Sequence, residues 1–217
     1  PDEPIIFMQV ALVNGIASNI QEVLDEDAAA ADPEKMNTAV FYSITNCQRG
    51  LGGVGFGSFL IKQVVDDLSR HLPNIRTFCT LSPIPGFRAW LDRQSADTTD
   101  PEQVLLRPEE RAPLEQLVSH AAGDGAITTL LDSERWWQDP DLAAALRVPL
   151  LRLCARYFLE VGPDGRVLDR VAHFHLSNGA IIEHINWLGD TSEKGIQESC
   201  GMMVNYLYKL SEIEKNH

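Results

Sequence analysis

Short apolar runs alternate along the chain with amphipathic stretches, and this pattern predicts strands interleaved with helices. Strands are expected where the runs are apolar and rich in β-formers, at Pro4–Val13, Thr38–Ile44, Arg76–Leu81 and Ala180–Trp187. Helices are expected where apolar residues recur at helical spacing, at Asn19–Asp25, Phe59–Leu72, Gly86–Leu91, Glu109–Ala121, Ile127–Trp137, Pro140–Leu146, Pro149–Leu159, Val167–Leu176 and Glu193–Leu210.

This order of elements predicts an α+β (α/β layered) domain. The 217 residues are enough for one domain, 1–217, with a well-buried core. A polar, proline-bearing excursion from Asp92 to about Pro108 begins a helical insertion over about residues 92–160. Ser18 and Gln21 form a capping-box signature for the first helix. Both chain ends, Pro1 and His217, are expected to be cuts in a longer protein.

Composition and net charge limit the kinds of partner that this protein can bind. The net charge of −13 disfavours a nucleic-acid partner, although backbone N–H groups and a local cation can still bind an anionic cofactor. No apolar run approaches the ~20 residues of a membrane span. The N-terminus has no signal-peptide pattern, and the four scattered cysteines show no zinc-site spacing. We therefore expect a cytoplasmic protein without a membrane partner, or a mitochondrial or peroxisomal one if a targeting signal lies beyond either end.

The strongest local signal is a glycine-rich turn between a strand and a helix. It carries five glycines in eleven residues, in the order Gln48, Arg49, Gly50, Leu51, Gly52, Gly53, Val54, Gly55, Phe56, Gly57 and Ser58. Glycines allow close backbone approach, and a helix N-terminus favours negative charge, so the turn is typical of a phosphate cradle. No Gly-Lys-Ser/Thr follows, and the glycine spacing fits a dinucleotide fingerprint poorly. The alternative is a turn without a ligand.

Ser82 opens a run with two prolines, Ser-Pro-Ile-Pro-Gly-Phe, directly after a predicted strand. The prolines restrict the backbone around Ser82, so its side chain is held at a strand end, where open sheets tend to bind ligands. Considered alone, however, the run is better explained as a structural turn in which Ser82 caps the next helix.

Two histidines, His173 and His175, lie two residues apart in a predicted helix, so at most one faces a given site and metal binding by both is disfavoured. Asn205, Tyr206 and Tyr208 form a polar and aromatic group in the predicted last helix. A tyrosine there could donate a proton into a cleft, or the group could be an aromatic core contact.

Together these segments resemble the malonyl-CoA decarboxylase family. The matching runs are TAVFYSIT, QRGLGGVGFGSFLIKQVV, TLSPIPGFRAWL, PLLRLCARYFL, VAHFHLSNGAIIEHINW and GIQESCGMMVNYLYKL, of which LSPIPGF and FHLSNGA are the specific ones. The resemblance implies a catalytic domain with an acetyltransferase-like mixed sheet flanked by helices. It places the coenzyme A pyrophosphate at Gln48–Ser58 and assigns catalytic roles to Ser82, His175 and Tyr208. It also implies an N-terminal helical domain, absent from this chain, and a homo-oligomer in the full-length protein.

The resemblance further implies decarboxylation of malonyl-CoA to acetyl-CoA and CO2. The thioester is itself the electron sink, so no cofactor or metal is expected beyond the coenzyme A of the substrate. We expect Ser82 to hold an oxygen, Tyr208 to orient the site and His175, with a pKa near neutrality, to protonate C2. Some family members have a glutamate where this chain has Gly55, so that carboxylate role does not carry over. The alternatives are an acyl-CoA-dependent N-acyltransferase and a non-catalytic acyl-CoA-binding domain.

Overall fold

The structure is a computed structural model that describes residues 6–27, 32–46, 57–96, 105–117 and 126–209. Within these residues the strands are β1 (Ile6–Val13), β2 (Thr38–Asn46), β3 (Thr77–Thr80), β4 (Ser82–Pro83), β5 (Ile181–Asn186) and β6 (Met203–Leu207). They form one mixed sheet in the order β1-β2-β3-β6-β4, and β5 also pairs with β6. β2 and β3 run parallel with Thr38 opposite Thr77, and the other pairs are antiparallel.

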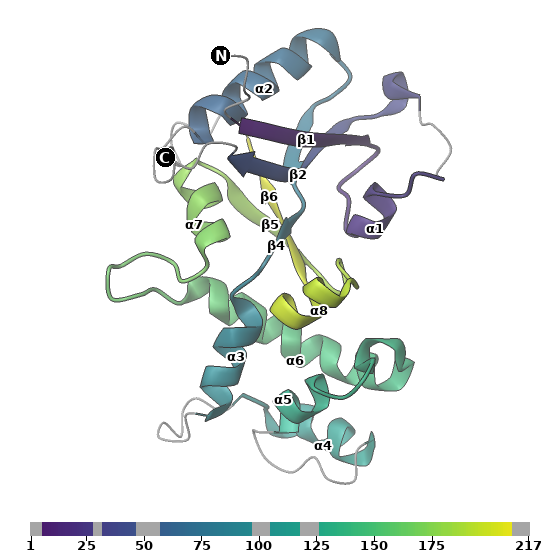
Figure 1. The fold of residues 1–217 in the computed structure, drawn as a ribbon, viewed down its shortest axis with the longest axis vertical. Coiled ribbons are helices and arrows are strands. Elements are labelled where there is room, and N and C mark those ends of the chain that lie inside the picture. Colours follow the sequence, from purple (N-terminus) through teal and green to yellow (C-terminus); the bar gives the residue numbers. More distant parts are fainter. Residues whose placement is uncertain (1–5, 28–31, 47–56, 97–104, 118–125, 210–217) are drawn as a thin grey trace.

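The helices flank this sheet and continue beyond one end of it (Figure 1). In the described residues they are α1 (Ile20–Val23), α2 (Gly57–His71), α3 (Phe87–Ala96), α4 (Pro108–Leu117), α5 (Ala126–Leu131), α6 (Pro140–Leu159), α7 (Arg170–Ser177) and α8 (Glu193–Ser199), with short 3-10 turns at Pro33–Lys35 and Trp136–Gln138. Helices α3 to α6 gather at the end of the molecule away from α2. The prediction of a mixed sheet flanked by helices with a helical insertion is confirmed.

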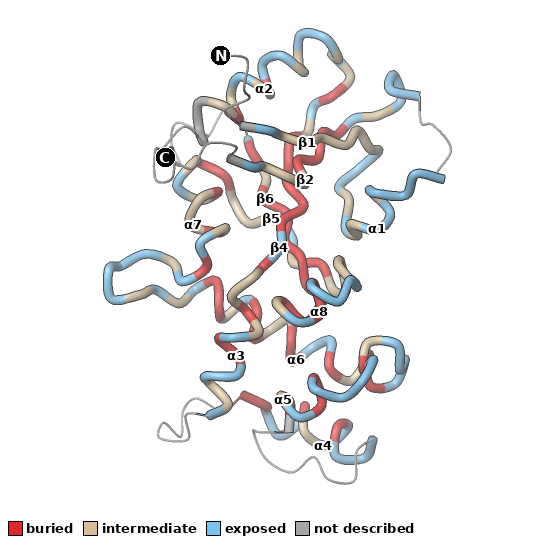
Figure 2. The backbone as a smooth tube through the Cα atoms, viewed as in Figure 1, coloured by how far each residue is buried: buried red, intermediate tan, exposed pale blue. Residues whose placement is uncertain are grey.

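One hydrophobic cluster joins the sheet to the helical insertion. Buried residues follow the central strands and continue through α6 (Figure 2), where Leu146, Leu150 and Leu153 are fully buried. Burial at this spacing keeps α6 helical across Pro149, although a proline supplies no N–H for the turn before it. The prediction of two separate helices here is therefore wrong.

The prediction of one closing helix from Glu193 to Leu210 is also wrong. Helix α8 ends at Ser199, because Cys200 and Gly201 both take left-handed backbone angles, with φ of 53° and 75°. The chain then reverses and enters the sheet as β6, between β3 and β5. Tyr208 consequently follows a central strand, where its backbone N–H donates to Phe78 O at 2.9 Å.

Four smaller predictions need correction. Asn19, and not Ser18, caps α1, because its Oδ1 accepts the N–H groups of Gln21 and Glu22. The strand expected at Arg76–Leu81 ends at Thr80, where the chain continues into β4. The helix expected over Ile127–Trp137 is divided into α5 and a 3-10 turn, since Arg135 takes a left-handed φ of 58°.

The last of these corrections concerns the polar excursion at Asp92–Pro108. Helix α3 continues to Ala96, and Leu105 and Leu106 are buried rather than exposed.

No helix in the described part of the chain is both long and apolar enough to span a bilayer.

Candidate active site

Ser82 lies in β4, immediately beyond the point where β3 ends. The prolines at 83 and 85 keep the segment extended, and Ser82 pairs with Val204 of β6. The Leu81 N–H donates to Phe41 O at 3.0 Å, which joins the start of this segment to β2. Its side chain is buried with 5% exposure, so the hydroxyl faces other protein groups and not bulk water.

His175 lies in α7, whose first turn is capped by Asp169. One carboxylate oxygen of Asp169 accepts from the N–H groups of Val171 and Ala172, which fixes where the helix begins. The two histidines differ in exposure. His175 is 4% exposed, whereas His173 is partly exposed on another side of the helix. The structure thus separates the two histidines as predicted.

The imidazole of His175 joins Ser82 to Tyr208, although Ser82 and His175 are 93 residues apart. His175 Nε2 lies 3.3 Å from Ser82 Oγ, and His175 Nδ1 lies 2.7 Å from the Tyr208 hydroxyl oxygen. The Ser82 hydroxyl donates to Thr80 Oγ1 at 2.8 Å. The structure therefore brings together the three residues that the resemblance singled out, and adds Thr80.

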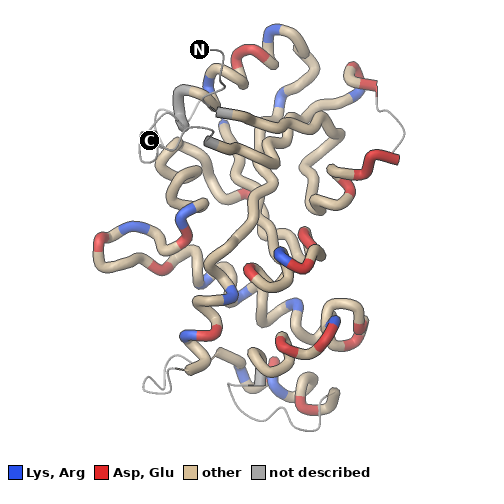
Figure 3. Tube along the Cα trace, viewed as in Figure 1, with Lys and Arg blue, Asp and Glu red and all other residues tan. Residues whose placement is uncertain are grey.

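Burial decides the protonation state of this cluster. Loss of water around the ring lowers the pKa of His175 to about 3, so the imidazole is neutral at neutral pH. The expectation of a near-neutral pKa is wrong for this arrangement. Burial also raises the pKa of Tyr208, so its hydroxyl keeps its proton. Figure 3 shows no charged residue along β4 and β6.

The group predicted at Asn205, Tyr206 and Tyr208 is divided between the two faces of the sheet, because side chains alternate along a strand. Tyr206 stacks on His175, with ring centroids 4.5 Å apart and an interplanar angle of 24°. Asn205 points the other way, where its Oδ1 accepts from Asn186 Nδ2 at 2.7 Å. The sequence contains a signal for this alternation, because Val204, Tyr206 and Tyr208 recur at the two-residue spacing of a strand. The prediction of a helix over this segment missed it.

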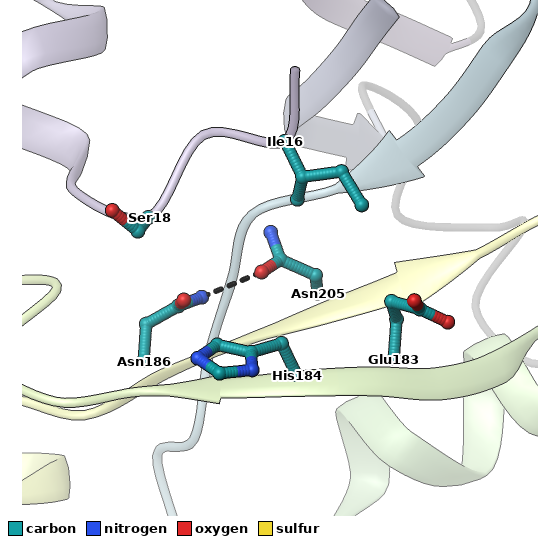
Figure 4. A pocket seen from close by; sticks show the side chains of 6 residues that line it. All are labelled: Ile16, Ser18, Glu183, His184, Asn186 and Asn205. Atoms are coloured by element: carbon teal, nitrogen blue, oxygen red, sulfur yellow. Dashed lines mark hydrogen bonds between the residues drawn. The ribbon is translucent and has the colours of Figure 1, made fainter.

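A pocket of about 300 Å³ lies on the Asn205 side of the sheet (Figure 4). It is lined by Ile16, Ser18, Glu183, His184, Asn186 and Asn205. Sequence reasoning did not identify these residues as a group, because they come from three separate segments of the chain. Since Asn205 and Tyr206 face opposite sides, this pocket and His175 lie on opposite faces of the sheet.

The predicted phosphate cradle falls mostly outside the described residues. This is so for Gln48, Arg49, Gly50, Leu51, Gly52, Gly53, Val54, Gly55 and Phe56. Gly57 and Ser58 open α2, a helix of 15 residues whose first turn carries no acidic residue. Among the described residues no group of three or more His, Cys, Asp or Glu side chains is arranged to hold a metal ion.

Comparison with known proteins identifies the family of this chain. The family model described as "Malonyl-CoA decarboxylase C-terminal domain" matches residues 1–217. The chain is 42% identical over 220 residues to a goose (Anser anser anser) protein and 40% identical over 222 residues to one from Rattus norvegicus, both named "Malonyl-CoA decarboxylase, mitochondrial". Each match covers 100% of this chain but 44% of the relative, so the chain spans less than half the length of these relatives.

Solved structures give the same result. The crystal structure of malonyl-CoA decarboxylase from Rhodopseudomonas palustris matches with a TM-score of 0.85 and 46% identity, over 100% of this chain and 46% of that one. The one from Agrobacterium vitis matches with a TM-score of 0.83 and 47% identity, over 99% of this chain and 49% of that one. From the family match over the whole chain and these identities, the chain belongs to the malonyl-CoA decarboxylase family.

Proposed function

We propose that this chain carries the decarboxylation of malonyl-CoA to acetyl-CoA and CO2. The observation that carries the proposal is the meeting of Ser82 and His175, 3.3 Å apart, in a chain of this family. Each residue comes from a different part of the fold, and together they present a hydroxyl and a neutral imidazole in a buried site.

The reaction needs a place for negative charge on the thioester. When the bond between C2 and the carboxylate breaks, its electron pair moves onto the thioester, and an enolate oxygen forms as CO2 leaves. A hydrogen-bond donor aimed at that oxygen in a water-poor site is worth about 3–4 kcal/mol. We assign this role to the Ser82 hydroxyl, which turns from Thr80 Oγ1 to the substrate oxygen when the thioester binds.

The second requirement is a proton for C2. Because burial holds the pKa of His175 at about 3, an imidazolium is not the proton source. His175 instead gives its Nε2 proton to C2 while Nδ1 takes the proton of the Tyr208 hydroxyl, 2.7 Å away. After the product leaves, a proton from solvent returns to Nε2 and Nδ1 gives its proton back to Tyr208, which restores the starting tautomer. One proton is thus consumed for each malonyl-CoA that becomes acetyl-CoA.

For the coenzyme A part of the substrate, we assign Gln48–Ser58. The support is that β2 precedes this segment and the N-terminus of α2 follows it, and the first turn of α2 has no carboxylate to oppose a phosphate. Within the protein, the proposed chemistry uses Ser82, His175 and Tyr208 with the thioester as electron sink, and we propose no further cofactor.

The test is to incubate the purified protein with malonyl-CoA alone and to measure acetyl-CoA and CO2. We expect both products without any acyl acceptor, and Ser82→Ala to lower kcat by about 100- to 1,000-fold while coenzyme A binding persists. Ser177→Ala is the matched control, since Ser177 is an exposed serine of α7. Turnover that appears only after an amine is added would favour an N-acyltransferase, and binding without turnover would favour a binding domain.

A further inference from the structure

Strands β3 and β6 separate at Thr80, and side chains replace the backbone hydrogen bonds there. The strand pairing joins β3 to β6 at Cys79 and Leu207, and the next pair, Ser82 with Val204, already belongs to β4. Between them the backbone N–H of Tyr206 donates to Thr80 Oγ1 at 3.1 Å, and Asn205 Nδ2 donates to Thr80 O at 2.8 Å. The main chain and the side chain of Thr80 are both held by β6.

This arrangement gives Thr80 Oγ1 two donors. One is the backbone N–H of Tyr206, which cannot rotate as a hydroxyl can. The other is the Ser82 hydroxyl at 2.8 Å. The hydrogen of Ser82 therefore points at Thr80 and away from His175. The contact between Ser82 Oγ and His175 Nε2 then requires the hydrogen to sit on Nε2, and Nδ1 accepts from Tyr208.

We propose that Thr80 is a positioning residue: before substrate binds, it accepts the Ser82 hydrogen and so sets the tautomer of His175, which is already in place when Ser82 turns to the thioester oxygen. The inference rests on the proposed decarboxylation, in which Nε2 must carry the proton that C2 receives. Without the Thr80 hydroxyl, Ser82 would donate to Nε2, and the imidazole would carry its hydrogen on Nδ1. The site would keep its shape but lose the proton at the reacting position.

Asn205 fixes Thr80 in this role. Its Nδ2 donates both to Thr80 O and to Ala17 O at 2.9 Å, so it joins the strand end to the segment before α1. Its Oδ1 accepts from Asn186 Nδ2. Thr80 and Asn205 are both fully buried, so no solvent competes for these bonds. The direction in which the Ser82 hydrogen points is consequently set from the opposite face of the sheet.

The kinetic test uses Thr80→Val, which keeps the shape and removes the hydroxyl, and Thr80→Ser, which restores it. We expect Thr80→Val to lower kcat by about tenfold to 100-fold with little change in KM, and Thr80→Ser to recover most of that loss. Thr38→Val is the matched control, because Thr38 is a threonine of the same sheet with 1% exposure whose hydroxyl donates to Asn37 and not to the site. Equal kcat for Thr80→Val and Thr38→Val would overturn the proposal.

Two further measurements do not depend on turnover of the valine variant. Imidazole nitrogen shifts from NMR should show the Nε2–H tautomer of His175 in the unsubstituted protein, and the Nδ1–H tautomer in Thr80→Val. An Nδ1–H tautomer in the unsubstituted protein would overturn the proposal even if Thr80→Val does not fold. In a double-mutant cycle, Thr80→Val should cost little once Ser82→Ala is present. An unsubstituted protein that shows Nε2–H but no turnover would instead contradict the proposed function alone.

Discussion

Two tyrosines at the end of β6 contact the same imidazole in different ways. Tyr208 places its hydroxyl 2.7 Å from His175 Nδ1, whereas Tyr206 lays its ring on the imidazole. The Tyr206 hydroxyl is buried and has no hydrogen-bond partner among the described residues. The two hydroxyl groups should therefore have opposite effects when they are removed.

We predict that Tyr208→Phe lowers kcat by about tenfold to 100-fold, because a buried hydrogen bond worth roughly 1–3 kcal/mol and the proton supply to Nδ1 are both lost. The measurement is steady-state turnover of malonyl-CoA. Tyr206→Phe is the matched comparison: it keeps the stacked ring and removes an unpartnered hydroxyl, so thermal unfolding should show a Tm that is unchanged or higher. A larger loss of kcat in Tyr206→Phe than in Tyr208→Phe would contradict this reading.

Some residues of the candidate site could be predicted from the sequence, and others could not. The helical spacing of His173 and His175 showed that only one could face a site, and LSPIPGF marked Ser82 by its rigid backbone. Thr80 carried no such signal. Its role depends on two donors, the Tyr206 N–H and the Ser82 hydroxyl, of which the former comes from a strand that the sequence pattern had presented as a helix.

At the scale of elements, Asp169 connects the Ser82 segment to the His175 helix. One of its oxygens caps α7, and its carboxylate also accepts from the Tyr157 hydroxyl at 3.3 Å and from the Gly86 N–H. Gly86 approaches Tyr157 so closely that an added Cβ would collide with the phenol oxygen. Burial raises the pKa of Asp169, and the surrounding donors offset part of that rise.

We predict that Asp169→Ala destabilises the fold by more than the loss of a helix cap. A cap alone is worth about 0.5–2 kcal/mol, and each buried donor left unpaired adds about 1–3 kcal/mol. The measurement is urea unfolding. Asp139→Ala supplies the cap-only value, because Asp139 caps α6 in the same way but is exposed.

Asp169→Asn separates the two roles. Asparagine also caps helices well, so the start of α7 should survive, while the amide nitrogen cannot accept from Tyr157 or Gly86. We expect a destabilisation between those of Asp139→Ala and Asp169→Ala. If Asp169→Ala and Asp139→Ala are equally destabilising, the carboxylate does not connect the two elements.

At the scale of the whole molecule, His175 couples stability to pH. Its pKa is about 3 in the folded state and near 6.5 when exposed, so the unfolded chain binds the proton first as the pH falls. The free energy of unfolding is thus greatest above the unfolded-state pKa, and this contribution is lost progressively as the pH falls from about 6.5 toward 3.

We predict that His175→Gln gives a flatter dependence of Tm on pH between about 7 and 4, since the glutamine does not titrate. Differential scanning calorimetry at several pH values measures this slope. His173→Gln is the control on the same helix, where the side chain is partly exposed, and it should keep the slope of the unsubstituted protein. Identical slopes for the two variants would show that His175 is not the buried neutral group described above.

The sequence by itself determined the layered α+β class, most strands and the rigid Ser82 segment, because these follow from local periodicity and backbone restriction. Spacing also determined that at most one of His173 and His175 faces a given site, whereas the choice of His175 came from the resemblance to the family. Tertiary structure alone decided that residues 203–207 form a strand, since a short apolar run fits helix or strand until its neighbours are known. It also decided the pKa of His175, because burial by Tyr206 and Tyr208 comes from segments distant in the sequence.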